Sequence, residues 1–281
     1  MTFLENVDKT KLQKITLIVI SALVLTALAL LLVIIIMSIS TNATTVEIDN
    51  KVLFTGSLVL ADEDHPYTVD ASNLDLVEGC QTYRNNQLIA DGIEATKANY
   101  PYIAYAGMQL TTPAMEAAHR MLSDAKEAVG QKALTIDAAY GLIYNTDTNN
   151  EEFKTGNLMF ISDYLSESGA HVPLSKEYRE WFDANAYKYG FIESFEDGYR
   201  YVGVAHAKLM KDKNITTLAD YIAYLKKNTN ADKMISVKVG NEEYSVYYVA
   251  CKAGDKVRVP LGADYTVSGT NEGGVVITIK K

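Results

Sequence analysis

Few residues in this sequence combine a type and a spacing that could do chemistry. The 281 residues include four His and two Cys, which excludes a Cys-rich zinc module and a disulfide scaffold. Asp163, Glu167 and His171 lie within one short stretch and have side chains that can bind a metal ion, although their spacing matches no established metal motif. The sequence contains no G-x-S-x-G nucleophile turn and no G-x-x-x-x-G-K-[ST] phosphate loop. These motifs therefore define no catalytic site by themselves.

The composition is that of an acidic, globular chain. Hydrophobic residues make up 48% and charged residues 22%, and 26 Lys and Arg stand against 35 Asp and Glu, a net charge of -9. The apolar content disfavours disorder, and the negative charge disfavours a nucleic-acid partner because phosphate binding needs a basic face. Cys80 and Cys251 are far apart in the sequence, which leaves open whether they form a disulfide or remain separate thiols.

The longest apolar run covers residues 15–37 and contains no charged residue. As a helix it would extend about 35 Å, enough to cross a hydrocarbon core about 30 Å thick. Three Lys lie in residues 1–14, whereas residues 38–45 after the run carry no positive charge. The positive-inside rule therefore predicts a retained, single-pass signal anchor with the N-terminus inside and residues 38–281 outside. A cleaved signal peptide is the alternative.

The outer part has the pattern of an α+β protein. Apolar runs predict strands at 52–61 and 133–140. Three further segments have the apolar periodicity and the end signals of helices. They are 112–129, 174–189 and 217–226. From residue 230 onward, alternating residues broken at Gly240 and Asn241 predict an antiparallel hairpin followed by more short strands.

Several segments, in order along the chain, resemble the landmarks of VanY-type D-Ala-D-Ala carboxypeptidases. The most specific are NAYKYGFI at 185–192 and RYVGVAHA at 200–207. Members of that family are zinc metallopeptidases that remove the terminal D-alanine from bacterial peptidoglycan stem peptides. The resemblance covers residues 52–281 and implies a carboxypeptidase-like mixed domain with a small antiparallel sheet and flanking helices.

The family's chemistry, as the resemblance implies it, uses two His and one Asp on zinc, a Glu as general base and an Arg for the substrate carboxylate. Matching the motifs places Phe153 and Phe160 at the first His and the Asp. Gly198 stands at the second His, Phe195 at the general base and Gly141 at the substrate Arg. Because neither Phe nor Gly offers a ligand atom in its side chain, we expect no catalytic residue, no metal ligand and no zinc.

The resemblance and these losses together predict a carboxypeptidase-like pseudoenzyme rather than an enzyme. We expect its old groove to bind a peptidoglycan stem peptide or a cell-envelope protein such as a wall enzyme. The candidate groove-binding residues are Tyr140, Thr155, Gly156, Tyr199, Arg200 and Tyr201. The alternative is an active D-Ala-D-Ala carboxypeptidase with a rearranged zinc site. If the motifs are matched correctly, Phe153, Phe160 and Gly198 must converge on one spot in the fold.

The chain is predicted to be located at the bacterial cytoplasmic membrane and to consist of five parts. They are a cytoplasmic head (1–14), a transmembrane anchor (15–37), a stalk (38–51), a D-Ala-D-Ala carboxypeptidase-like domain (52–229) and a small β module (230–281). The head would lie inside the cell, and everything after the anchor would lie outside it.

Overall fold

A computed structural model of the chain describes residues 9–41, 43–78, 102–105, 107–130, 133–143, 150–165 and 168–281. The chain forms two compact units, Met1–Thr45 with Arg258–Gly262, and Val46–Val257 with Ala263–Lys281. Cys80 lies outside the described residues, so the choice between a disulfide and separate thiols stays open.

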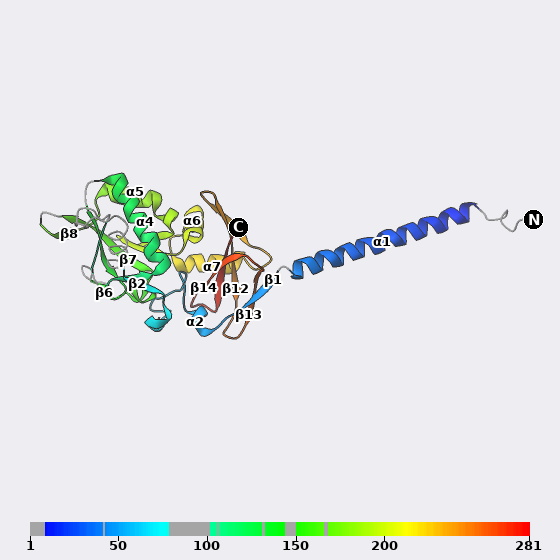
Figure 1. The fold of residues 1–281 in the computed structure, drawn as a ribbon, viewed down its shortest axis with the longest axis horizontal. Helices are drawn as coiled ribbons and strands as arrows, with labels where there is room; N and C mark the ends of the chain where they lie inside the picture. Colours follow the sequence, from blue (N-terminus) through cyan, green and yellow to red (C-terminus); the bar gives the residue numbers. More distant parts are fainter. Residues whose placement is uncertain are drawn as a thin grey trace, which may run out of the picture. The chain divides into compact units, whose positions relative to one another are not determined.

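The first unit consists mainly of one long helix, α1 (Lys9–Thr41), drawn in blue in Figure 1. Its Lys14–Leu31 segment is long and apolar enough to cross a membrane, and its side chains are exposed along that whole segment. The following strand β1 (Ala43–Glu47) pairs with β13 (Lys256–Pro260). Residues 38–51, predicted as a stalk, therefore contain the end of α1 and strand β1.

The second unit is built on a seven-stranded sheet. Its main strands follow the order β3 (Tyr102–Ala104), β5 (Ala133–Ala139), β7 (Leu158–Leu165), β10 (Gly198–Tyr201) and β9 (Phe191–Phe195). Strand β6 (Leu142–Ile143) adds to β5, and β8 (Ala170–Val172) adds to β7. All pairings except that of β3 with β5 are antiparallel. A mostly antiparallel sheet flanked by helices confirms the predicted α+β class.

Two of the predicted helices pack against each other beside this sheet (Figure 1). Helix α4 (Thr112–Val129) ends at Gly130, which takes the left-handed φ of 75° that a helix end requires. The segment predicted as one helix at 174–189 is α5 (Lys176–Asn185) followed by the 3-10 turn η4 (Ala186–Tyr189). The buried faces of both helices join the sheet in one hydrophobic cluster, which contains Met115, Met121, Tyr178, Phe182 and Tyr199. A short ribbon of β2 (Leu76–Glu78) and β4 (Gln109–Thr111) lies ahead of α4 in the chain.

A second hydrophobic cluster joins the last helices to the C-terminal strands. Its elements include α6 (Val204–Lys213), α7 (Leu218–Asn228), β11 (Ile235–Val239), β12 (Glu242–Ala250) and β15 (Gly274–Lys280). The three strands and β14 (Asp264–Gly269) form one sheet in the order β11-β12-β15-β14, which includes the predicted hairpin. His206 of α6 links the layers, because its ring nitrogens hydrogen-bond Tyr221 Oη at 2.7 Å and Thr278 Oγ1 at 2.8 Å. The predicted boundary at residue 229 therefore does not separate two hydrophobic cores.

The strand predicted at 52–61 is wrong. The run begins inside the short helix α2 (Asn50–Leu53), whose first turn is capped by the Asp49 carboxylate. The apolar residues that follow are buried but join no strand ladder, and the Leu58 N–H donates instead to Ser268 Oγ at 2.9 Å. A short apolar run indicates burial, and burial alone does not fix an extended, paired backbone.

Candidate functional site

The positions expected to hold the zinc ligands and the general base meet at one place on the seven-stranded sheet. Gly198 of β10 lies opposite Phe160 of β7 on one side and Phe195 of β9 on the other. Phe153, from the 3-10 turn η3 (Glu151–Thr155), approaches the same place. The ring centroids of Phe153 and Phe160 are 5.7 Å apart, and those of Phe160 and Phe195 are 5.9 Å apart. The predicted convergence of Phe153, Phe160 and Gly198 is confirmed, and we call the three phenyl rings the aromatic plug.

The aromatic plug is packed as a small hydrophobic core of its own. Ala138, which pairs with Phe160 across β5 and β7, and Leu158 complete the cluster. Phe153 is buried, while Phe160 and Phe195 keep part of their surface exposed. Centroid separations below 6 Å are typical of stabilising aromatic pairs, so the rings hold one another in place.

Gly198 is required by the rings that close over it. A Cβ atom at this position would lie 2.9 Å from Phe160 Cζ and 2.9 Å from Phe195 Cβ. Because glycine has no side chain, it leaves room for the two phenyl rings, which cover strand β10 at this position. An aromatic ring that covers a glycine on a neighbouring strand is a recognised means of stabilising a sheet.

These residues do not fit zinc. A zinc site needs three protein ligands with nitrogen, oxygen or sulfur atoms, and neither the phenyl rings nor Gly198 supplies one from a side chain. Within the described ranges, no group of three or more His, Cys, Asp or Glu side chains is placed to hold a metal ion. The local chemistry is that of a hydrophobic contact.

The position expected for the substrate-binding Arg lies in a tight turn between β5 and β6. Gly141 is exposed and has a left-handed φ of 85°. A Cβ there would lie 2.5 Å from the Gly107 carbonyl oxygen, so an Arg would require the backbone to move. The neighbouring Tyr140 stays half-buried, and its carbonyl accepts the Gln109 N–H at 2.9 Å.

Thr155 and Gly156, predicted to bind in the groove, instead build the turn that positions Phe153. The Thr155 hydroxyl donates to the Glu152 carbonyl at 2.7 Å, and it is buried. Gly156 has a φ of 68°, and its carbonyl accepts the Thr111 N–H at 2.7 Å. Both residues fix η3 to the rest of the unit and have no surface for a ligand.

Tyr199 and Arg200 are also in the interior. Tyr199 is 2% exposed and packs against Phe182, with ring centroids 5.1 Å apart. Arg200 is 1% exposed, and its guanidinium donates to the Val59 carbonyl at 2.9 Å and to the Glu152 carboxylate at 3.2 Å. Both side chains therefore pack inside the unit. Of the six candidates only Tyr140 and Tyr201 are partly exposed, and groove binding stays a prediction for all six.

Two of the three residues of the alternative metal site, Asp163 and His171, lie in the described part of the chain. Both ring nitrogens of His171 are engaged, Nδ1 with the Asp137 carboxylate at 2.6 Å and Nε2 with the Tyr105 hydroxyl at 2.7 Å. Asp163 accepts the Ser175 N–H at 3.2 Å, and Glu167 lies outside the described residues. Sequence patterns gave no sign of the pair between Asp137 and His171, because 34 positions separate them.

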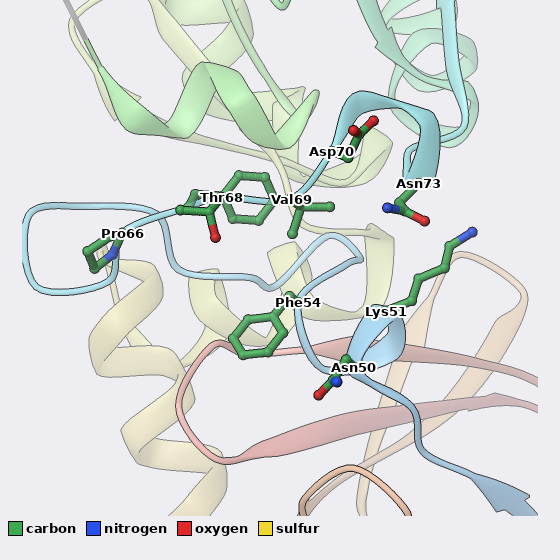
Figure 2. Close-up of a pocket in the computed structure, with 9 residues that line it drawn as sticks. Asn50, Lys51, Phe54, Pro66, Thr68, Val69, Asp70 and Asn73 are labelled. Carbon is green, nitrogen blue, oxygen red and sulfur yellow. The ribbon is translucent and has the colours of Figure 1, made fainter.

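A cavity of about 410 Å³ lies between α2 and the loop that follows it (Figure 2). Figure 2 shows Lys51 and Phe54 on one side of this cavity and Thr68, Val69 and Asp70 on the other. Its buried wall residue is Tyr67, whose pKa is raised to about 12 by burial, an effect that the Arg200 charge partly offsets. The cavity mixes apolar and charged side chains, and no sequence motif marks it.

The comparisons with known proteins agree with this fold. No family model matches the chain. A D-alanyl-D-alanine carboxypeptidase of Enterococcus faecium is 34% identical over 113 residues, which is 36% of this chain and 36% of that protein. The chain thus spans about a third of the length of this curated relative.

Two solved structures are similar to the chain. The vancomycin-resistance D,D-dipeptidase VanXYg, solved in complex with a D-Ala-D-Ala phosphinate analogue, gives a TM-score of 0.60 at 16% identity and covers 85% of this chain and 99% of its own. The LdcB LD-carboxypeptidase gives a TM-score of 0.33 at 21% identity and covers 53% of this chain and 77% of its own. The likeness to VanXYg defines a VanX-like carboxypeptidase fold. Over the matched 113 residues, the sequence is similar to that of the enterococcal D-alanyl-D-alanine carboxypeptidase.

Proposed function

We propose that this protein is a non-catalytic relative of the VanY-type D-Ala-D-Ala carboxypeptidases, a carboxypeptidase-like pseudoenzyme of the bacterial cell envelope that binds peptidoglycan stem peptides or a wall-enzyme partner. The observation that carries the proposal is the aromatic plug. Phe153, Phe160 and Phe195 pack together at the positions matched to two zinc ligands and the general base, and Gly198 lies beneath them. Without a metal-bound water and a base to take its proton, a peptidase of this type has no nucleophile.

The choice of ligand follows from the family and from the surface that remains. The curated relative is named a D-alanyl-D-alanine carboxypeptidase, and VanXYg was solved with a D-Ala-D-Ala analogue. In this chain, Tyr140 is partly exposed, as are two rings of the aromatic plug. Aromatic side chains of this kind bind the apolar parts of a peptide while excluding water.

The location we propose is the outer face of the bacterial cytoplasmic membrane. The Lys14–Leu31 segment of α1 has the length and composition of a membrane span, and the lysines before residue 15 favour an inside N-terminus. Residues 38–281 would then face the cell wall, where stem peptides are found.

One experiment separates this proposal from an active enzyme with a rearranged zinc site. The full chain is purified in detergent micelles, its zinc content is measured, and D-alanine release from a muropeptide ending in D-Ala-D-Ala is followed. We expect no stoichiometric zinc and no release above the rate in buffer. Near-equimolar zinc together with release that a chelator abolishes would overturn the proposal.

A binding measurement tests the proposed binding of stem peptides. The same muropeptide is titrated into the wild type, Tyr140→Ala and Tyr187→Ala, the last changing a partly exposed tyrosine in η4. We expect saturable binding that weakens in Tyr140→Ala only. If the wild type does not bind the muropeptide, the stem-peptide form of the proposal is refuted and a protein partner remains.

A further inference from the structure

A second cavity, of about 290 Å³, lies away from the aromatic plug. One wall is the pair of strands β9 and β10, where Glu193 lies directly opposite Tyr199. Successive residues of a strand point to opposite faces of the sheet, so Tyr199 faces away from the side on which Gly198 meets the plug. This cavity is therefore independent of the function proposed above.

The walls of the cavity are largely apolar. Phe182 of α5, Phe191 of β9 and Ile215, which follows α6, contribute to them. Phe182 and Phe191 are fully buried, so these rings are fixed before anything binds. A cavity of this size and lining suits a small molecule with a hydrocarbon part.

The polar groups in the cavity are two carboxylates and one phenol. Asp183 and Glu193 provide the carboxylates, and Tyr199 provides the hydroxyl. Tyr199 is 2% exposed, and no hydrogen bond to its hydroxyl is formed within the described part of the chain. The hydroxyl is not one of the fully buried polar atoms without a partner, so a ligand in the cavity can reach it and form a hydrogen bond with it.

Acidic side chains outnumber basic ones in the lining of the cavity. Burial raises the pKa of the Glu193 carboxyl, and the charges of Asp183 and Asp197 raise it further, against opposing effects of the Asp197 N–H and Arg179. The one basic side chain among the lining residues, Lys211, donates to the Asp183 backbone carbonyl at 2.9 Å and lies 4.3 Å from the Tyr187 ring centroid. It is thus directed to a carbonyl and an aromatic ring, and no ion pair joins it to either carboxylate in the described structure.

We infer that this cavity binds a small organic ammonium ion, with its hydrocarbon part against Phe182, Phe191 and Ile215 and its N–H groups donating to Glu193 and Tyr199. A carboxylate that accepts from an ammonium group forms a charge-assisted hydrogen bond, the stronger kind. A bare metal ion is disfavoured, because the carboxylates belong to no group of three or more metal-ligating side chains in the described ranges.

The probe that tests this inference is n-butylammonium chloride, with 1-butanol as the uncharged molecule of equal chain length. Each is titrated into the full chain in detergent micelles at pH 7.5. The single tryptophan, Trp181, reports the binding, because its ring contacts Phe182 with centroids 5.3 Å apart. We expect saturable binding of n-butylammonium and at least tenfold weaker binding of 1-butanol. Equal binding of the two, or no saturation by either, would overturn the inference.

Two substitutions and a matched control locate the site. Glu193→Gln removes one charge with little change of shape and should weaken the binding of n-butylammonium at least tenfold. Tyr199→Phe should weaken that binding severalfold. Glu180→Gln removes the same charge from an exposed side chain of α5 that pairs with Lys176, and should leave binding unchanged. An equal loss in Glu180→Gln and Glu193→Gln would show a general charge effect and refute the assignment. If Tyr199→Phe does not fold, the comparison of the two Glu variants still decides.

Discussion

Replacing Gly198 with alanine inserts one carbon atom into the contact between two phenyl rings. The new Cβ would lie 2.9 Å from Phe160 Cζ and 2.9 Å from Phe195 Cβ, both shorter than an ordinary van der Waals contact. The Phe160 ring could turn away, but Phe195 Cβ is fixed to the backbone of β9. Overpacking of this kind costs about 1–3 kcal/mol, and a glycine replaced by alanine recovers up to about 1 kcal/mol from the unfolded state. We therefore expect Gly198→Ala to lower the free energy of unfolding by about 1–2 kcal/mol.

A double-mutant cycle tests the cause of that loss. Urea unfolding of the full chain in micelles is followed by the fluorescence of Trp181 for the wild type, Gly198→Ala, Phe160→Ala and the double variant. Because Phe160→Ala removes one of the two clashing groups, the alanine at 198 should cost at least about 0.5 kcal/mol less in that background. Additive losses, or a Gly198→Ala variant as stable as the wild type, would refute the packing described for the aromatic plug.

Three further predictions concern stability and use the same unfolding assay. Burial lowers the pKa of folded His206 to about 3, whereas the pKa of the unfolded side chain is near 6.5. The unfolded state therefore binds more protons as the pH falls. The free energy of unfolding should drop by up to about 1.4 kcal/mol per pH unit below pH 6.5. In His206→Gln, the free energy of unfolding should depend less steeply on pH between pH 7 and 5 than in the wild type. An unchanged pH dependence would contradict this. Arg200→Met leaves the Glu152 carboxylate and a backbone carbonyl without their donor and should cost about 3–5 kcal/mol, so a loss below 1 kcal/mol would argue against the buried pair. Thr217→Ala removes the N-cap of α7 and should cost about 1 kcal/mol, while Thr216→Ala should cost almost nothing.

The elements that the sequence predicted well are those whose signals are local. Helix α7 begins where Thr217 caps it, and α4 ends where Gly130 takes a left-handed φ. The strand predicted at 52–61 failed because its hydrogen-bond partners come from remote parts of the chain, such as Ser268, 210 positions from Leu58. Apolar residues predicted the burial, but nothing nearby could predict the path of the backbone.

The candidate site, too, could be predicted only in part from the sequence. Motif matching predicted that Phe153, Phe160 and Gly198 lie together, and the strand register and the ring contact between Phe153 and Phe160 agree. Motif matching could not distinguish a residue that faces a groove from one that supports it. Arg200 is the plainest example, since the carbonyl that accepts its hydrogen bond belongs to Val59, 141 positions away.

The hydrophobic cluster shared by the helices and the C-terminal strands constrains the order of folding. Leu58 and Val276 belong to that cluster, and β15 lies between β12 and β14 in the sheet. A chain that emerges N-terminus first must therefore keep Leu58 out of its final packing until β15 has emerged and paired. Contacts over such separations are slow to form, and exposed apolar surface is prone to aggregate in the meantime. The interval between the synthesis of Leu58 and the pairing of β15 is therefore the period in which assistance from a chaperone would matter most to this chain.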